Sequence, residues 1–366
     1  MRDVRNRVDN YFKSENLNKT ANGSMVLKTV LILTGWVVTY ALVISNFLPG
    51  YALLILALFH GFFTALIGLN IAHDAIHGSY SRNPKINKRI GLLFNLIGAN
   101  DYMWSISHNI VHHTYTNIPE HDEDINQPAI LRLEESQKLR WIHRFQHIYA
   151  LMLYTLSSLS WVFVKDYVKF FQHQLGGHFR RTFPRKEIFR LFAYKAVYYT
   201  IFLVIPLVVI DLSWYWIVFG FILSHLVEGF TLAIVFMLAH IIEGTKFPEP
   251  DADGTLDMAW SELQMHTTSN FAIGNRVVNY LTGGLNFQIE HHLFPKVCHI
   301  HYPAISKIVK ETSKEHNLPY LEQPTFLGAI ASHCRVLRKM GRKPQSGRPE
   351  PAKVKNAEAL AGSLTR

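Results

Sequence analysis

Four long runs of apolar residues dominate the pattern of the chain, and each is about twenty residues long or slightly more. That is the length at which a helix crosses the roughly 30 Å hydrocarbon core of a bilayer. The runs come in two pairs, and a short turn joins the members of each pair, so each pair predicts a transmembrane hairpin. The sequence therefore predicts an all-α integral membrane protein with four transmembrane helices, at residues 29–48, 51–71, 191–210 and 214–238.

The basic residues indicate how these helices are oriented. The two tight turns carry no Lys or Arg, whereas nearly all basic residues lie before residue 29, between residues 73 and 190, or after residue 240. Cytoplasmic segments of membrane proteins carry such an excess of Lys and Arg. We expect both termini and the large middle loop to face the cytosol, and Lys195 to reach toward the same face.

Two further stretches, residues 148–164 and 90–104, are also apolar and could enter the membrane. The first is just long enough to cross a thin bilayer. If it crossed, an odd number of spans would put the histidine clusters described below on opposite sides of the membrane. We therefore expect both stretches to be helices that lie at the membrane interface or pack against the spans.

Composition narrows the class of protein. Hydrophobic residues make up 49% of the chain and charged residues 17%, which is apolar for a soluble protein. The net charge of +10 favours anionic lipid headgroups or an acidic partner over nucleic acid, because the basic residues lie beside apolar runs. Two cysteines are too few for a disulfide framework or a thiolate metal site. Twenty histidines, in contrast, indicate a metal.

Polar segments flank the apolar region. Residues 1–28 lack the apolar core and cleavage site of a secretory signal, so we expect a cytosolic N-terminal segment. Residues 341–366 are rich in Lys, Arg, Pro, Ser and Ala, which predicts a basic, disordered tail. One domain, residues 29–340, remains between these segments.

Histidines gather in three clusters, which the predicted topology places on one side of the membrane. They read HDAIH at residues 73–77, HNIVHH at 108–113 and QIEHH at 288–292. Residues three or four apart share a helix face. A lone pair of this kind is more often a structural hydrogen-bonding pair than a metal site, but three clusters predict a shared metal centre. The residues that this spacing brings together are His73 with His77, His108 with His112, with His113 displaced toward a neighbouring position, and Gln288 with His291 and His292.

The number of ligands predicts two metal ions. Seven histidines exceed the needs of a four-coordinate zinc site, and the lack of thiolates argues against structural zinc or copper(I). Imidazole suits iron. Two irons at the cytosolic ends of membrane helices can reduce dioxygen beside a buried aliphatic chain, which is the chemistry that breaks an unactivated C–H bond. The sequence thus predicts a cytosolic helical cap that holds a histidine-ligated diiron site.

Three motifs, HDAIHGS, HNIVHHTYTN and LNFQIEHHLFP, resemble the histidine boxes of the membrane fatty acid desaturase superfamily. With the four-helix layout, the resemblance covers residues 29–337. Gln288 at the start of the third box resembles the front-end branch, which includes delta-6 and delta-5 acyl enzymes, and the stretch from Trp260 through Gln264, Thr268 and Asn270 is similar to that branch as well. The resemblance implies an oxygen-dependent enzyme that inserts a cis double bond into an acyl chain carried by coenzyme A or a phospholipid.

The resemblance also implies a set of iron ligands. His240 follows the fourth apolar run as the family's isolated ligand does, and Gln288 stands where many relatives have histidine, so it is a candidate ligand, directly or through water. The ligands implied for two iron ions are His73, His77, His108, His112, His113, His240, His291 and His292.

The resemblance raises the question of where the electrons come from. Many front-end members carry a fused cytochrome b5 domain with a His-Pro-Gly-Gly motif, which this sequence lacks. We expect a separate donor, either ferredoxin or free cytochrome b5. The lack of the fused domain favours the bacterial plasma membrane over the endoplasmic reticulum.

Other polar residues are expected in supporting positions. Asp74 and Glu290 flank ligands, where a carboxylate can accept the second imidazole N–H and orient the ring, and Asn270 is expected to act with them. His225 and Glu228 are ionisable groups inside an apolar run, where such residues usually face protein or a cavity. Either a helix–helix hydrogen bond or the lining of an acyl channel accounts for them.

The remaining histidines are not expected to bind the irons. His60 and His225 lie too far along their helices from His73 and His240. His266 departs from the pattern of the front-end branch and is not expected to be a ligand. Five others are expected at the surface or the membrane interface: His121, His143, His147, His299 and His301.

Three alternatives stay open. Related histidine clusters also support hydroxylases, ketolases and alkane monooxygenases, although the third-box wording QIEHHLFP favours desaturation. A histidine-rich metal transporter would need polar residues through several spans, and these runs are almost wholly apolar. A membrane adaptor gives no reason for so many histidines at ligand spacing.

Overall fold

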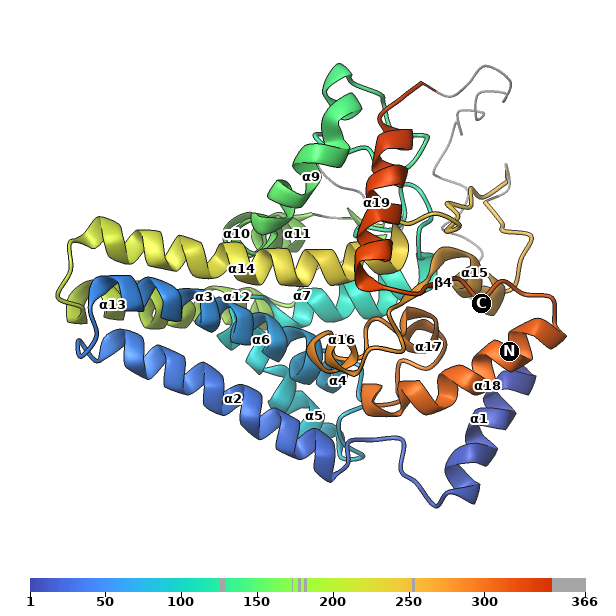
Figure 1. Cartoon of the computed structure of the whole chain (residues 1–366), viewed down its shortest axis with the longest axis horizontal. Coiled ribbons are helices and arrows are strands. Elements are labelled where there is room, and N and C mark those ends of the chain that lie inside the picture. Colours follow the sequence, from blue (N-terminus) through green and yellow to red (C-terminus); the bar gives the residue numbers. More distant parts are fainter. Residues whose placement is uncertain (126–128, 173, 177–178, 181–182, 252–253, 344–366) are drawn as a thin grey trace.

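The computed structural model describes residues 1–125, 129–172, 174–176, 179–180, 183–251 and 254–343. Helices make up most of this part, and four of them are long and apolar enough to cross a membrane (Figure 1). The prediction of four such helices is confirmed. They are α2 (Gly23–Ile44), the continuous helix α3–η1–α4 (Gly50–Leu66, Ile67–Ala72, His73–Ile76), the continuous helix α12–η5–α13 (Arg185–Tyr199, Thr200–Val204, Ile205–Val209) and α14 (Trp214–His240).

The first long helix begins earlier than its uncharged run. Asn22 caps α2 by accepting a hydrogen bond from the Met25 N–H at 3.1 Å. Lys28 therefore lies inside the helix, where it is buried. The uncharged run seen in the sequence starts only after Lys28. The helix starts earlier, because a capping residue can begin it and a neighbouring group can accept the buried charge.

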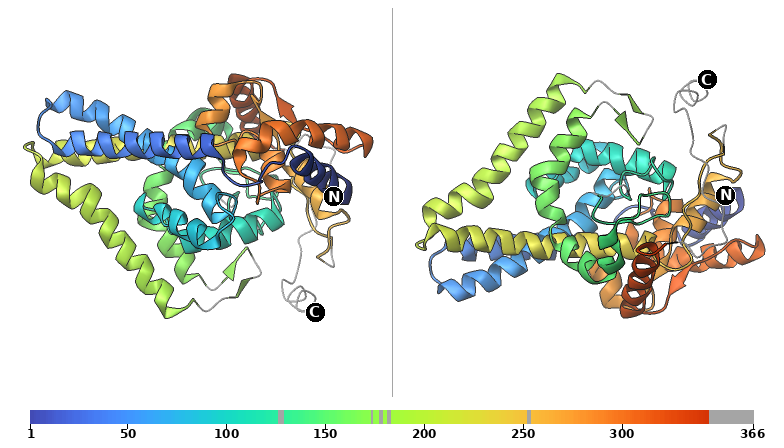
Figure 2. Two further views of the ribbon diagram at one scale, coloured as in Figure 1. Left: turned by 90° about the horizontal axis from the view of Figure 1, so that it is seen from below. Right: turned by 90° about the horizontal axis from the view of Figure 1, so that it is seen from above.

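The four long helices do not form a parallel bundle. α3 packs against both α2 and α14. In both views of Figure 2, α12–η5–α13 leans away from α14, and the segment of residues 84–171, coloured cyan to green, fills the angle between them. Its elements are α5 (Pro84–Gly91), α6 (Leu93–Leu96), α7 (Asp101–Ile106), η2 (Ser107–His112), α8 (His113–Tyr115), η3 (Trp141–Phe145), α9 (Gln146–Thr155), α10 (Ser157–Ser160), η4 (Trp161–Lys165) and α11 (Asp166–Phe171).

The apolar stretch at residues 148–164 is bent. The helix axis bends by 62° between its two arms, Trp141–Thr155 and Ser157–Phe171. α9 and α10 pack against α14 around this bend, as expected. Taken together, the two arms are also long and apolar enough for a broken span, so their position at the membrane interface stays a prediction. The expected interfacial stretch at 90–104 is divided between the end of α5, α6 and the start of α7.

Lys195 does not reach toward the membrane surface, and that expectation is wrong. Its side chain is buried. Its Nζ lies 2.7 Å from Asp166 Oδ2 and donates hydrogen bonds to the carbonyl oxygens of Gly98 and Val162. The middle segment covers this part of α12, so the charge is paired inside the protein.

The C-terminal third covers the histidine-bearing end of the long helices (Figure 1). The N-terminal α1 (Arg2–Ser14) packs against α18. Two short sheets complete the fold: β1 (Gln174–Leu175) pairs antiparallel with β2 (Phe179–Arg180), and β3 (Asn270–Phe271) pairs parallel with β4 (Glu322–Gln323). The expected basic tail at 341–366 lies outside the described residues from 344 onward. The C-terminal helices are α15 (Trp260–Thr267), α16 (Arg276–Leu281), α17 (Gln288–Leu293), η6 (His299–His301), α18 (Tyr302–Glu315) and α19 (Phe326–Met340).

Gly283 lies in the turn between α16 and α17, where this turn touches the second long helix. Its φ is +64°, and a Cβ there would lie 2.3 Å from the carbonyl oxygen of Leu69 in η1. The neighbouring Asn70 Nδ2 donates to the carbonyl oxygen of Leu281 at 3.2 Å. This close backbone approach holds the third histidine cluster beside the first.

We expect Gly283→Ala to lower the free energy of unfolding by more than about 1 kcal/mol, because alanine disfavours a positive φ and clashes with Leu69. The measurement is the Tm of the detergent-solubilised protein. Gly274→Ala is the matched control, since nothing lies within 4 Å of a Cβ at that position. Equal Tm values for the two variants would contradict the prediction.

Candidate metal centre

Eight histidines from five parts of the chain converge at one end of the long helices. His73 and His77 lie at the end of the second long helix, and His240 ends α14. The others come from η2 and α8 and from α17. All eight side chains are buried: His73, His77, His108, His112, His113, His240, His291 and His292.

The ring nitrogens form two adjoining groups, in each of which the atoms lie within 4.8 Å of one another. The first group is His73, His77, His108 and His291, and the second is His112, His240 and His292. His113 forms a third group with His291 and His292, so it lies between the first two. Adjacent histidines of the second and third clusters thus serve different groups, which is the arrangement that two metal ions need.

π-helical turns accompany the first two clusters. η1 ends just before His73, and η2 contains both His108 and His112. Such turns are rare and often lie at functional sites. The expectation that His108 and His112 share a helix face is confirmed, because their rings stack with centroids 5.1 Å apart. Both also form a group with Asp124, although each belongs to a different one of the two histidine groups.

The ring atoms that face inward have no hydrogen-bond partner in the described part of the chain. This holds for the buried Nε2 atoms of seven histidines, and a buried polar atom without a partner costs about 1–3 kcal/mol. Metal coordination would satisfy all of them at once. The seven are His73, His77, His108, His112, His113, His291 and His292.

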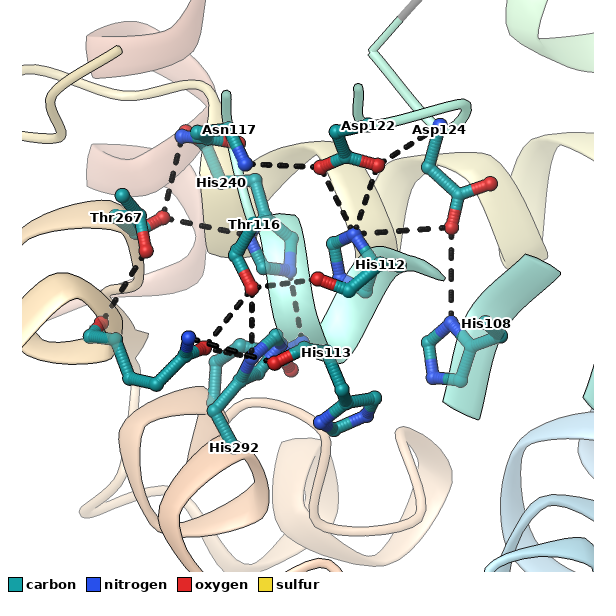
Figure 3. A network of polar contacts seen from close by, with 12 residues as sticks. His108, His112, His113, Thr116, Asn117, Asp122, Asp124, His240, Thr267 and His292 are labelled. Atoms are coloured by element: carbon teal, nitrogen blue, oxygen red, sulfur yellow. Dashed lines mark hydrogen bonds and ion pairs between the residues drawn. The ribbon is translucent and has the colours of Figure 1, made fainter. Parts of the chain in front are cut away.

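The opposite nitrogens of the second group are held by the protein (Figure 3). His112 Nδ1 lies 2.9 Å from Asp122 Oδ2, and this carboxylate also accepts the Asn117 N–H at 2.9 Å. His292 Nδ1 lies 2.7 Å from Gln264 Oε1. These contacts orient the rings so that Nε2 points inward.

The first group has its own carboxylates. Asp124 Oδ2 lies 3.6 Å from His108 Nδ1, and Asp74 Oδ1 lies 3.6 Å from His73 Nδ1. The other oxygen of Asp74 is 2.9 Å from His299 Nδ1. Lys28 Nζ contacts His299 Nε2 at 3.0 Å, so a buried chain of side chains links the first long helix to His73.

The expectation of surface positions was wrong for three histidines, because His143, His299 and His301 are buried. The C-terminal helices and the middle segment cover them. Sequence reasoning also missed Asp122, Asp124 and the supporting role of Gln264. The acidic run EHDED at residues 120–124, close behind the second cluster, was the available signal.

The other expected supporting residues act on the backbone around the site. Glu290 accepts hydrogen bonds from Asn270 Nδ2 at 2.8 Å and from Tyr320 OH at 3.0 Å, and it contacts no histidine of the two groups in the described structure. Asn270 Oδ1 accepts the Ile289 N–H at 3.0 Å, which fixes the start of α17. Gln288 Nε2 lies 2.9 Å from His240 Nε2, so this side chain faces the second group.

Electrostatics favour neutral imidazoles in most of the site. Burial lowers the pKa of His77, His108, His113, His291 and His292. Burial also lowers the pKa of His112, but the charge of Asp122 and its hydrogen bond outweigh this and raise the pKa above its usual value. Burial raises the pKa of Glu290 to about 7. A neutral imidazole is the form that binds a metal.

A cavity of about 360 Å³, which we call the metal-side cavity, reaches the first group. His73, His108 and His291 form part of its wall, and apolar side chains such as Trp104 and Phe236 form much of the rest. Glu228 lies at this wall, whereas His225 does not. His60 bonds with Thr39 among the long helices, and His266 lies 3.9 Å from Glu262, both outside the two groups.

Comparison with known proteins identifies relatives over nearly the whole chain. A family model described as fatty acid desaturase matches residues 49–324. The chain is 35% identical to an sn-1 linoleoyl-lipid 6-desaturase of Arthrospira platensis, over 94% of this chain and 93% of that protein. It is 36% identical to a protein of the same name from Synechocystis sp., over 93% and 95%. An acyl-lipid (8-3)-desaturase of Physcomitrium patens is 36% identical over 92% of this chain and 71% of that protein.

Asp122→Asn tests the supporting carboxylates. The amide keeps the size and an acceptor oxygen but loses the charge that orients His112, so we expect metal affinity to fall by about 10–100-fold. Metal content under chelator competition is the measurement. Asp9→Asn is the control, because Asp9 is a half-exposed partner of Lys19. Retention of metal equal to that of the control would refute the role of Asp122.

Proposed function

Because the chain belongs to the fatty acid desaturase family, we propose that it inserts a cis double bond into the acyl chain of a membrane lipid, with dioxygen as the oxidant and a separate electron donor. Family membership makes the protein an oxidoreductase of lipid metabolism, and its four apolar helices make it an integral membrane protein. The observation that carries the proposal is a pair of adjoining histidine groups, the first of which forms part of the wall of an apolar cavity.

Two iron ions fit these groups. His73, His77, His108 and His291 would hold one, and His112, His240 and His292 the other, with His113 between them and Gln288 beside His240. Imidazole ligands suit iron, and the described groups of the two sites contain no thiolate. When bound, the irons would supply the reduction of dioxygen to two waters, with two external electrons, two protons and the two hydrogens removed from adjacent carbons of the chain.

The protein's own part is positioning. The apolar wall of the metal-side cavity would hold one C–C bond beside His73, His108 and His291 and exclude water. The carboxylates of Asp122, Asp124 and Asp74 would keep the imidazole rings in place while the substrate changes.

The names of the relatives favour a lipid as the carrier of the acyl chain. Two cyanobacterial relatives are named linoleoyl-lipid desaturases, and the relative from Physcomitrium patens is named an acyl-lipid desaturase. These names favour an acyl group on a lipid over acyl-CoA as the substrate. We place the protein in a bacterial plasma membrane, with both termini and the histidines on the cytosolic side. Ferredoxin or free cytochrome b5 would deliver the electrons there.

The direct test is expression in a host with a simple lipid profile that is fed candidate fatty acids. Mass spectrometry of the lipids should show products two hydrogens lighter, with the new double bond mapped by fragmentation. A product heavier by one oxygen would establish a hydroxylase instead. No new product from any fed chain, with the protein present in the membrane, would contradict the proposal.

His112→Ala should abolish the product, since it removes a buried ligand of the second group. The protein should still accumulate in the membrane, because the four apolar helices are untouched. His316→Ala is the matched control, because its side chain is 55% exposed and pairs with Asp3, outside the histidine groups. Product formation by His112→Ala at the level of the control would exclude the proposed centre.

Purified protein should contain about two irons per chain, as two groups of three or four imidazoles require. Elemental analysis by mass spectrometry measures this. Active preparations with stoichiometric zinc and no iron would exclude the assignment of the metal.

A further inference from the structure

The metal-side cavity ends at a wall inside the helix bundle. Ile97 and Glu228 line this cavity, and the same two residues also line a second cavity of about 370 Å³. The second cavity, which we call the membrane cavity, lies among α2, α3, α12–η5–α13 and α14. It extends as far as Gly50 and Leu212, at the turns remote from the histidines.

Hydrogen bonds cross the wall from one cavity to the other. Tyr198 and His225 line the membrane cavity, whereas Ser158 lines the metal-side cavity. Tyr198 OH contacts His225 Nε2 at 2.8 Å, Ser158 Oγ contacts His225 Nδ1, and Ser158 Oγ donates to Glu228 Oε2 at 3.0 Å. All four polar side chains are buried, so each depends on these bonds.

The wall is rigid, because the backbone of α14 is in contact with the backbone at the bend between α9 and α10. A Cβ on Gly229 would lie 2.5 Å from the carbonyl oxygen of Thr155 and 2.9 Å from the Ser158 nitrogen. Ser157 Oγ also donates to the Gly229 carbonyl at 2.8 Å. α14 is thereby pressed against the bend between α9 and α10, which holds Ser158 opposite Glu228.

The two ends of the metal-side cavity differ in polarity. Asp124, Lys165 and Lys169 line it near His108, and the apolar part extends along α14 to Glu228. Glu228 lies twelve residues before His240, about 18 Å at a rise of 1.5 Å per residue. A lipid would place its polar head beside Asp124, Lys165 and Lys169, because charged groups are costly to bury against a hydrocarbon chain, whereas Glu228 is already hydrogen-bonded to Ser158. Its methyl end would then point toward Ile97 and Glu228.

We propose that Ile97 and Glu228, braced by Ser158, His225 and Tyr198, are specificity-determining residues that set the longest acyl chain the enzyme accepts. This inference rests on the proposed function. A methyl group that reaches the wall meets polar groups already bonded to one another, so it cannot pass into the membrane cavity. Ionisable groups inside a span often mark function in this way.

The test compares wild type with Ile97→Ala and Glu228→Ala, each fed sixteen-, eighteen-, twenty- and twenty-two-carbon chains. Either substitution should join the two cavities. The wild type should show a length above which conversion falls. In both variants we expect conversion of the first rejected length, relative to the longest accepted one, to rise about tenfold, since one methylene in an apolar pocket is worth 10-fold or more. The double bond should keep its distance from the carboxyl end.

Leu54→Ala is the control, because Leu54 lines only the membrane cavity and should leave the length limit where it was. Ile97→Ala removes no polar group, so it keeps the test valid if Glu228→Ala fails to accumulate in the membrane. A wild type with no upper limit, or wall variants with the wild-type limit, would overturn the inference while leaving the desaturase function intact. A shift of the double bond without a change of limit would also overturn it. A wild type that converts no chain would refute the proposed function itself.

Discussion

The main constraint on the structure is that it must bury imidazole nitrogens that lack hydrogen-bond partners among the described residues. Seven inward-facing Nε2 atoms are buried without a hydrogen-bond partner in the described part of the chain, and each represents a desolvation penalty that an apolar core would avoid. The protein accepts this cost because the rings hold two groups of ligand atoms at metal-binding distance from one another. Burial also lowers the pKa of most of these histidines, which keeps them in the neutral form that coordinates a metal.

The surrounding structure holds these rings in position. Asp122 holds the outer nitrogen of His112, and Gln264 holds that of His292. Asp124 and Asp74 each place a carboxylate oxygen 3.6 Å from the Nδ1 of His108 and of His73. The acidic loop after the second cluster, Gln264 in the middle of α15 and the buried His299 therefore support the site, although their positions in the sequence do not indicate this role. Gly283 lets the turn before α17 lie against the backbone of η1, close to where the first cluster begins.

The membrane-facing part follows a different rule. Its helices are apolar, so the few polar groups inside it must satisfy one another, as Lys195 and Asp166 do and as Tyr198, His225, Ser158 and Glu228 do. Each set of bonded polar groups also has a structural effect. The first pins the middle segment to α12, and the second separates a cavity that reaches the histidines from one that does not.

The sequence by itself determined the four apolar helices, because their length and lack of charge are set locally by what a bilayer tolerates. It also determined the three histidine clusters, since ligand spacing is a property of a few neighbouring residues. Only the tertiary structure decided which clusters share a group, because rings from three distant segments meet in each of the two histidine groups. It alone placed Lys28, Lys195 and His299 in the interior, where partners from distant segments accept their charge or hydrogen bonds. A chain segment determines its own helical period and polarity. The partner that offsets the cost of burying one of its polar residues comes from elsewhere in the fold.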